Sequence, residues 1–277
     1  MIEAIKGSFR KLVCKSSDMV GLLDFMRQKG RVHYTGRIVL YHSIPSEHIE
    51  SFEQQICFLL ENYSIVSLTE FVNALSSTDH GGGDLIAVTI DEGFEECYRN
   101  AVPIFLKYRV PACFFISPNF IDLSERRDLK AIENFCHYNL LAKDIRSPMS
   151  WDNIRELKGL GFEIGSHTLS HAWCSRCTEE ELFVELDLSK DRIEREIAAE
   201  VTLFAFPFGT ERHVDARAVR IAKEVGYSCA CWARRGWNTP QTDLYKLHRD
   251  PIDPSWPLDV VRGVLSGIFD WWRPKVV

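Results

Sequence analysis

The sequence contains no run of about 18 consecutive apolar residues, the minimum for a helix that spans a bilayer. Residues 1–30 include basic side chains but no continuous apolar stretch, so we expect no secretory signal. The 33 Lys and Arg residues are outnumbered by 39 Asp and Glu residues, which gives a formal net charge of −6. Because a nucleic-acid-binding protein presents a basic surface, we expect no nucleic-acid partner.

The cysteines lack the pattern of a disulfide scaffold. There are nine, an odd number, and they are spread from Cys14 to Cys231. Small secreted scaffolds are short and pair their cysteines evenly, so we expect reduced thiols and a cytoplasmic location. The aromatic tail at residues 269–274 is a candidate for peripheral contact with the inner face of a membrane or with a partner. Packing of this tail against the body of the protein is the simpler expectation.

Short apolar runs alternate with amphipathic segments along most of the chain, without internal repeats. Predicted strands lie at residues 37–41, 64–68, 85–90, 112–116, 201–206 and 227–232, and a further strand ends near 165. Capping boxes at Ser67/Glu70 and Thr178/Glu181 mark the starts of two helices. Such alternation indicates a parallel, helix-covered sheet. About seven units predict a closed or nearly closed α/β barrel in a single domain, preceded by an N-terminal helical extension at residues 1–36.

One stretch departs from this alternation. Residues 118–149 have no clear period, and we expect a long loop with a short helix near residues 129–141.

Polar residues follow two of the predicted strands, where barrels place their chemistry. Asp91 and Glu92 follow residues 85–90, and His167 and His171 lie in the segment HTLSH. Two imidazoles and a carboxylate are a common ligand set for a catalytic divalent ion. Our hypothesis is that Glu92, His167 and His171 bind the metal, Asp91 acts as base, and a protonated histidine supplies the leaving amine with a proton. The alternative is that both histidines are polar caps in turns.

Two other interpretations compete within the same stretch. His167, His171, Cys174 and Cys177 have the spacing H-x3-H-x2-C-x2-C, which a closed structural zinc site could use. The pair Cys174 and Cys177 could also form a redox CxxC motif. Both interpretations leave Asp91 and Glu92 without a role, so we favour the catalytic metal site.

Taken together and in this order, the motifs resemble those of the polysaccharide deacetylase (NodB-homology) family. TIDEG at residues 89–93 is similar to the family's TFDDG, HTLSH to its HS/T-xx-H, and FAFPFG at residues 204–209 to its PYG-like turn. The likeness covers roughly residues 37–252. It implies a distorted (β/α)7 barrel domain over residues 37–277, with Asp91 as catalytic base. It also implies that Glu92, His167 and His171 bind a divalent metal ion, with zinc as the default.

Three positions depart from the family pattern. Glu92 stands in place of the usual Asp, which lengthens the side chain by one methylene. Ala205 stands where many members have an Arg that orients the base, and Arg249 is a candidate substitute from another strand end. The family's late general-acid His has an approximate counterpart in His248, but we prefer His42 as general acid and keep His248 as the alternative. A structural His42 that bonds a backbone carbonyl also remains open.

The expected function follows from this resemblance. The chain is predicted to be a carbohydrate deacetylase, a hydrolase that removes an N-acetyl or other small N-acyl group from an amino sugar of a bacterial surface or lipid-linked glycan. Its predicted substrate contacts are Pro207, Phe208, Gly209, Trp237 and Arg249, while Trp151 is expected to pack in the core. Two alternatives remain: a glycan-binding pseudoenzyme with impaired catalysis, and an amidohydrolase acting on a non-sugar metabolite.

Overall fold

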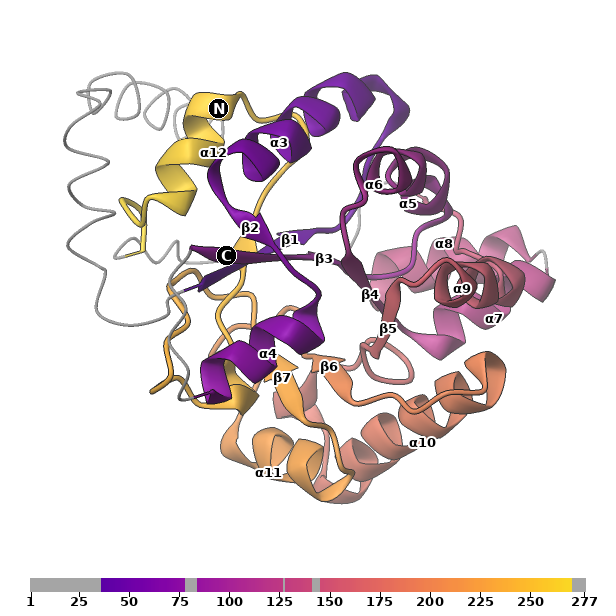
Figure 1. Cartoon of the computed structure of the whole chain (residues 1–277). Coiled ribbons are helices and arrows are strands. Elements are labelled where there is room, and N and C mark those ends of the chain that lie inside the picture. The colour runs from indigo at the N-terminus through magenta and orange to yellow at the C-terminus, as the bar shows by residue number, and fades with distance from the viewer. Residues whose placement is uncertain (1–35, 78–83, 127, 141–144, 271–277) are drawn as a thin grey trace, which may run out of the picture.

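The computed structural model describes residues 36–77, 84–126, 128–140 and 145–270 (Figure 1). The predicted N-terminal helical extension, residues 1–36, lies outside this range except for its last residue and stays a prediction.

The sheet consists of parallel strands that curl around a common axis (Figure 1). Its order is β7-β6-β5-β4-β3-β1-β8, and β2 pairs with β3 off this path. The strands are β1 (Gly36–Tyr41), β2 (Ser64–Ile65), β3 (Leu85–Ile90), β4 (Ala112–Ile116), β5 (Glu163–Ser166), β6 (Leu203–Ala205), β7 (Cys229–Cys231) and β8 (Asp250–Pro251). Leu247 bridges to Cys231 while Asp250 pairs with Val39, so the segment 247–251 joins β7 to β1. The predicted α/β barrel is confirmed.

The two central strands show why this sequence forms such a sheet. β1 is GRIVLY and β3 is LIAVTI, and nearly every side chain of both strands is buried. Their β-branched content suits a strand that is covered on both faces. The parallel register pairs Tyr41 with Ile90. The two strands therefore end at the same level, which brings His42 and Asp91 to one edge of the sheet.

Helices surround the sheet, as Figure 1 shows. The α-helices are α3 (Ile49–Asn62), α4 (Leu68–Ser76), α5 (Glu95–Asn100), α6 (Val102–Tyr108), α7 (Pro118–Arg126), α8 (Leu129–Tyr138), α9 (Trp151–Gly159), α10 (Glu179–Ile197), α11 (Ala216–Glu224) and α12 (Leu258–Leu265). Short 3-10 helices are η1 (Ser46–His48), η2 (Cys174–Arg176) and η3 (Leu244–Lys246). Both predicted capping boxes are present, at the starts of α4 and α10.

The structure differs from expectation between residues 118 and 149. The predicted long loop contains a further helix, α7, which begins at Pro118. Proline is well tolerated in the first turn of a helix, so here it marks a start and not a loop. α7 buries Phe120, Ile121 and Leu123, and α8 packs beside it.

The described residues contain no helix that combines the length and apolar character needed to span a bilayer. Part of the aromatic tail lies within the described chain. Phe269 is buried against Val264, which agrees with packing against the body. Residues 271–277 lie outside the described range, and the membrane contact expected there stays a prediction.

Candidate metal and catalytic site

Loops at the carboxyl edge of β3 and β5 bring the three predicted metal ligands together. Glu92 lies in the loop after β3, and His167 and His171 lie in the loop after β5. The two loops begin as continuations of the sheet, because Asp91 N donates to Tyr41 O and His167 N donates to Ile116 O. One ligand atom from each of Glu92, His167 and His171 lies within 4.8 Å of the other two, and all three residues are buried.

Backbone carbonyls fix the orientation of both imidazoles. His167 Nδ1 lies 2.7 Å from Ala205 O, and His171 Nδ1 lies 2.8 Å from Asn139 O. Because a carbonyl oxygen only accepts hydrogen bonds, each Nδ1 carries the proton. In a neutral ring the lone pair is then on Nε2, which faces the carboxylates. Histidines that bind metal are commonly held in this way by a second contact on the other ring nitrogen.

Two buried polar atoms of the cluster lack a hydrogen-bond partner. They are Glu92 Oε2 and His171 Nε2, which lie 3.1 Å apart. Two acceptors at this distance repel each other unless a proton or a cation lies between them. One carboxylate and two imidazole nitrogens are a donor set that suits a divalent cation. The residues present therefore fit a metal ion.

Electrostatics within the cluster point in the same direction. Burial lowers the pKa of His167 to about 4, although Asp91 and Glu92 oppose this shift, so the ring is neutral at pH 7. Burial alone would lower the pKa of His171, but the Glu92 carboxylate outweighs it and raises that pKa. In turn, the charge of His171 overcomes burial and lowers the pKa of Glu92 to about 2. A proton on His171 Nε2 thus competes with a cation for the same place.

Asp91 lies beside the cluster and is held by Arg249. The guanidinium donates from Nη1 to Asp91 Oδ1 at 2.6 Å and from Nη2 to Oδ2 at 2.7 Å. Asp91 Oδ2 is also 3.7 Å from His167 Nε2. Arg249 is fully buried, and its Nε donates to Trp232 O. Arg249 therefore contacts Asp91 and not the solvent, so we no longer count it among the substrate contacts. It reaches Asp91 from the segment before β8, a position from which it could take the place of the Arg missing at Ala205.

Backbone strain is concentrated at this edge of the sheet. Six non-glycine residues of the described chain have positive φ angles. Four of them belong to the site loops: Glu92, Thr168, His171 and Phe208. Positive φ is rare for side chains with a Cβ and persists where the surrounding structure enforces it, often at functional sites. Gly93 has φ 88°, a conformation that side chains with a Cβ rarely adopt, and a Cβ there would lie 2.8 Å from Ile121 Cδ1.

Of the predicted substrate contacts, Phe208 lies at the site. Its ring centroid is 4.7 Å from that of His171, and the side chain is half-buried. Pro207 and Gly209 form the turn that presents it. A Cβ at Gly209 would lie 2.3 Å from Ala233 N, so the turn requires glycine. We therefore assign Pro207 and Gly209 to the shape of the turn.

Trp237 and His248 are not brought to the site. The Trp237 ring lies 4.4 Å from Arg37 Cζ, at the amino end of β1, opposite to the end that carries His42. His248 exchanges backbone hydrogen bonds with the Asn238 side chain, which lies at the same amino end, and its Nδ1 is 3.3 Å from Arg235 O. Neither location supports the predicted role. Adjacent residues of an extended segment point to opposite faces, and here Arg249, not His248, points to Asp91.

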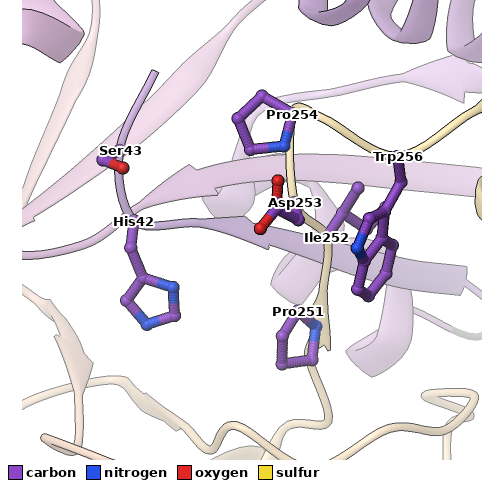
Figure 2. A pocket seen from close by; sticks show the side chains of 7 residues that line it. All are labelled: His42, Ser43, Pro251, Ile252, Asp253, Pro254 and Trp256. Carbon is purple, nitrogen blue, oxygen red and sulfur yellow. The ribbon is translucent and has the colours of Figure 1, made fainter. Parts of the chain in front are cut away.

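His42 is exposed and lines a cavity of about 230 Å³ next to the cluster. The other lining residues are Ser43, Pro251, Ile252, Asp253, Pro254 and Trp256. Figure 2 shows the His42 and Trp256 side chains on opposite sides of this cavity, with Asp253 between them. His42 is close enough to Glu92 for its charge to contribute to the low pKa of that carboxyl, after the larger effects of burial and the two other histidines.

Sequence reasoning missed two residues that extend the site. Trp173 lies 5.6 Å from Phe208 between ring centroids, and His213 lies 4.4 Å from Trp173 and 4.9 Å from Phe208. The available signal was nearness in sequence, because Trp173 follows the HTLSH motif and His213 follows the FPFG turn. Trp151 is buried in the core, as expected.

The alternative zinc site and the redox pair gain no support. Cys174 Sγ donates to Ala172 O, and Cys177 Sγ donates to Trp173 O. Both thiols are free. Within the part of the chain that the structure describes, the group of side chains able to hold a metal ion consists of Glu92, His167 and His171 and includes neither cysteine.

A parallel barrel with a buried carboxylate and imidazole cluster at the carboxyl ends of its strands defines an α/β-barrel enzyme with a candidate hydrolytic centre. Comparison with known proteins identifies the family. The profile of the polysaccharide deacetylase family matches residues 78–230, which is more than half of the chain. The chain belongs to the polysaccharide deacetylase family. The resemblance inferred from the motifs is confirmed, and so is the enzyme class that it implied, a carbohydrate deacetylase.

Individual relatives are distant but similar over most of their length. YxkH of Bacillus subtilis (strain 168), provisionally named a polysaccharide deacetylase, is 22% identical over 223 residues, covering 78% of this chain and 71% of YxkH. The deacetylase PplD of Streptococcus pyogenes, solved in complex with acetate, superposes with a TM-score of 0.68 at 19% identity, covering 83% of this chain and 97% of PplD. IcaB of Ammonifex degensii superposes with a TM-score of 0.67 at 20% identity, covering 84% of this chain and 97% of IcaB. These structures confirm the barrel fold.

Proposed function

We propose that the chain is a metal-dependent hydrolase that removes an N-acetyl or other small N-acyl group from an amino sugar of a bacterial surface or lipid-linked glycan. The observation that carries this proposal is the buried pair Glu92 Oε2 and His171 Nε2, 3.1 Å apart and without hydrogen-bond partners. Glu92, His167 and His171 would hold a divalent cation, with zinc as the default for such ligands. A bound cation of this kind polarises an acyl carbonyl and acidifies a water.

The proposed reaction assigns separate tasks to the remaining polar residues. Asp91 accepts a proton from the attacking water, whose oxygen bonds to the acyl carbon. Arg249 holds both Asp91 oxygens, so the carboxylate keeps its orientation toward the cluster. His42 gives a proton to the sugar nitrogen as the C–N bond breaks, so that a carboxylic acid and a free amine leave the site.

The cavity beside His42 is the proposed place of a sugar ring. Trp256 offers an aromatic face, and Asp253 and Ser43 offer hydrogen-bond partners for sugar hydroxyls. A ring bound there would direct its N-acyl group past His42 toward the cluster. Glu92, although longer than the family's Asp, reaches both imidazoles, with its oxygens 3.1 Å from His171 Nε2 and 4.0 Å from His167 Nε2. The substitution therefore gives no reason to prefer the pseudoenzyme.

The proposal is tested by measuring acetate released from N-acetylated chitotetraose. We expect release by the zinc-loaded protein, loss after chelation and recovery when zinc is returned. Asp91→Asn should retain one bound zinc per chain but lose at least about a thousandfold in kcat, because the base is missing. Asp243→Asn, at an exposed position, is the control.

Two results would count against this assignment. Full turnover by Asp91→Asn would remove the base from the mechanism. A zinc-loaded wild-type chain that binds the glycan but releases no acid would support the pseudoenzyme instead.

A further inference from the structure

An aromatic surface leads away from the metal-binding cluster on the side of β5 and β6. It consists of Phe208, Trp173 and His213, and we call it the aromatic ledge. Phe208 connects it to His171 at 4.7 Å between ring centroids. Phe208 and Trp173 are half-buried, so part of each ring faces the solvent.

Two arginines are placed over the ledge. Arg176 Cζ lies 3.6 Å from the centroid of the Trp173 ring, and Arg212 Cζ lies 5.2 Å from it. They come from different loops, since Arg176 ends η2 after β5 and Arg212 follows β6. Contact with an indole limits the conformations of a guanidinium and leaves its N–H edge available for an oxyanion.

Neither guanidinium forms an ion pair with a carboxylate of the described residues. Most arginines of the described chain lie within 4 Å of a carboxylate, including those nearby: Arg217 pairs with Asp215, Arg220 with Glu179, and Arg234 with Glu211. Within the described ranges, Arg176 and Arg212 form no such ion pair, and both are exposed. The ledge therefore carries two guanidiniums without a carboxylate partner among the described residues, in a chain whose net charge is −6.

The third member of the ledge, His213, is uncharged at neutral pH. Burial, together with the positive charges of Arg212 and Arg176, lowers the pKa of His213 to about 4. His213 therefore adds no charge at neutral pH, and its ring serves as a neutral wall beside Trp173. The ledge thus combines apolar ring faces with two positive charges, a chemistry that matches a sugar carrying an anionic substituent.

We propose that Arg176 and Arg212 bind an anionic oxygen group of the substrate, a phosphate or a carboxylate, on or next to the N-acylated sugar. This inference rests on the proposed function and specifies its substrate class. An N-acyl group at the cluster would place the adjoining part of the substrate over Phe208 and Trp173, with its oxyanion at the guanidiniums. The cavity at β1 and β8 and the ledge at β5 and β6 then contact different parts of one substrate.

The first test compares acid release from three N-acetylated sugars: methyl N-acetylglucosaminide, N-acetylglucosamine 1-phosphate and N-acetylmuramic acid. The first is neutral, the second carries a phosphate and the third a carboxylate. We expect kcat/KM to be at least tenfold higher for one of the anionic sugars. The double variant Arg176→Gln/Arg212→Gln should lose this preference through KM and keep its rate on the neutral sugar. Arg195→Gln/Arg220→Gln, which removes two exposed charges elsewhere, should behave as wild type.

A second test does not depend on turnover. Calorimetry should show N-acetylglucosamine 1-phosphate or N-acetylmuramic acid binding to zinc-loaded Asp91→Asn protein. Addition of the two Arg→Gln changes should weaken that binding at least tenfold. Arg176→Lys/Arg212→Lys should recover part of it, because it restores charge without the planar edge.

The outcomes separate the two proposals. Release of acid from all three sugars at equal kcat/KM would overturn the anionic subsite and leave the deacetylase function intact. Absence of acid release from every sugar would overturn the function, and the calorimetry would still decide the subsite. Binding of the anionic sugars that is unchanged by the double variant would also overturn the subsite.

Discussion

His42 and His248 both flank strands of the barrel, but their surroundings give them different chemistry. His42 is exposed in the cavity beside Glu92, where a leaving amine could be reached. His248 is held between Asn238 and Arg235 at the other end of β1. We expect His42→Asn to lower kcat by roughly a hundredfold or more, the usual contribution of a general acid. His248→Asn should stay within about twofold of wild type in the same acetate-release assay.

The zinc content and the melting temperature of both variants serve as controls. An equal loss of kcat in the two variants would point to a structural effect. Wild-type kcat in His42→Asn would mean that another group supplies the proton.

Some site residues could be identified from sequence because they are local to a motif. Asp91, Glu92, His167 and His171 follow apolar strands, and the parallel sheet brings those strand ends together. The contacts that orient them could not be identified in this way. The carbonyl partner of His171, Asn139, is 32 residues away, and the partner of Asp91, Arg249, is 158 residues away. The sequence around Trp237 gave no information about which end of the barrel its loop reaches, and the structure places its ring beside Arg37 at the amino end of β1.

At the scale of elements, the loops after β1 and β8 form the cavity in Figure 2. If a sugar ring stacks on Trp256, Trp256→Ala should raise KM for chitotetraose by roughly three- to tenfold, in line with about 0.5–1.5 kcal/mol for an aromatic contact. The value of kcat should change little, because Trp256 touches no reacting atom in the proposed mechanism. Trp256→Phe, which keeps a ring face, should recover most of the affinity.

Trp256 also packs against the core, so the melting temperature of each variant must be measured beside its kinetics. Unchanged KM in a folded Trp256→Ala protein would place the sugar elsewhere.

Element prediction succeeded where local signals agree with tertiary packing. The predicted strands overlap β1 to β7, and the capped helices α4 and α10 begin where predicted, whereas β8 was not predicted. Residues 95–108 form two helices, α5 and α6, which meet at Ala101. Pro103 explains the break, because it lacks the N–H that would continue the first helix. Pro118 alone did not distinguish α7 from a loop, because proline is common in both, and α7 also depends on the packing of Phe120 against Phe94 and Phe135.

At the scale of the whole molecule, a buried charge cluster makes folding stability depend on pH. Arg37 bonds Asp250 at 2.8 Å and Asp270 at 2.6 Å, so two carboxylates share one guanidinium. Burial, against the attraction of Arg37, raises the pKa of Asp250 to about 6 from an ordinary 3.8. The folded protein therefore binds this proton more tightly than the unfolded chain. The resulting stabilisation is fully present below about pH 4 and is lost as pH rises through about 6.

We expect this group to lower the free energy of unfolding by up to about 3 kcal/mol between pH 4 and pH 6.5. The measurement is urea unfolding across that range in wild type and in Asp250→Asn, whose side chain does not titrate. The free energy of unfolding of wild type minus that of Asp250→Asn should fall as pH rises from 4 to 6.5, whereas Asp243→Asn should follow wild type. Parallel curves for wild type and Asp250→Asn would contradict the assignment.

The segment 247–251 joins β7 to β1, and its alternating side chains face two ways: Arg249 toward Asp91 and Asp250 toward Arg37. This segment contains β8, which follows β1 to β7 in the sequence, so it is the last part of the sheet to leave the ribosome. Until then the sheet has two open edges, and Asp91 has no guanidinium to hold it. Protein synthesis therefore delays the contact between Arg249 and Asp91 until the fold is nearly finished, and the carboxylate receives its guanidinium only when the barrel closes.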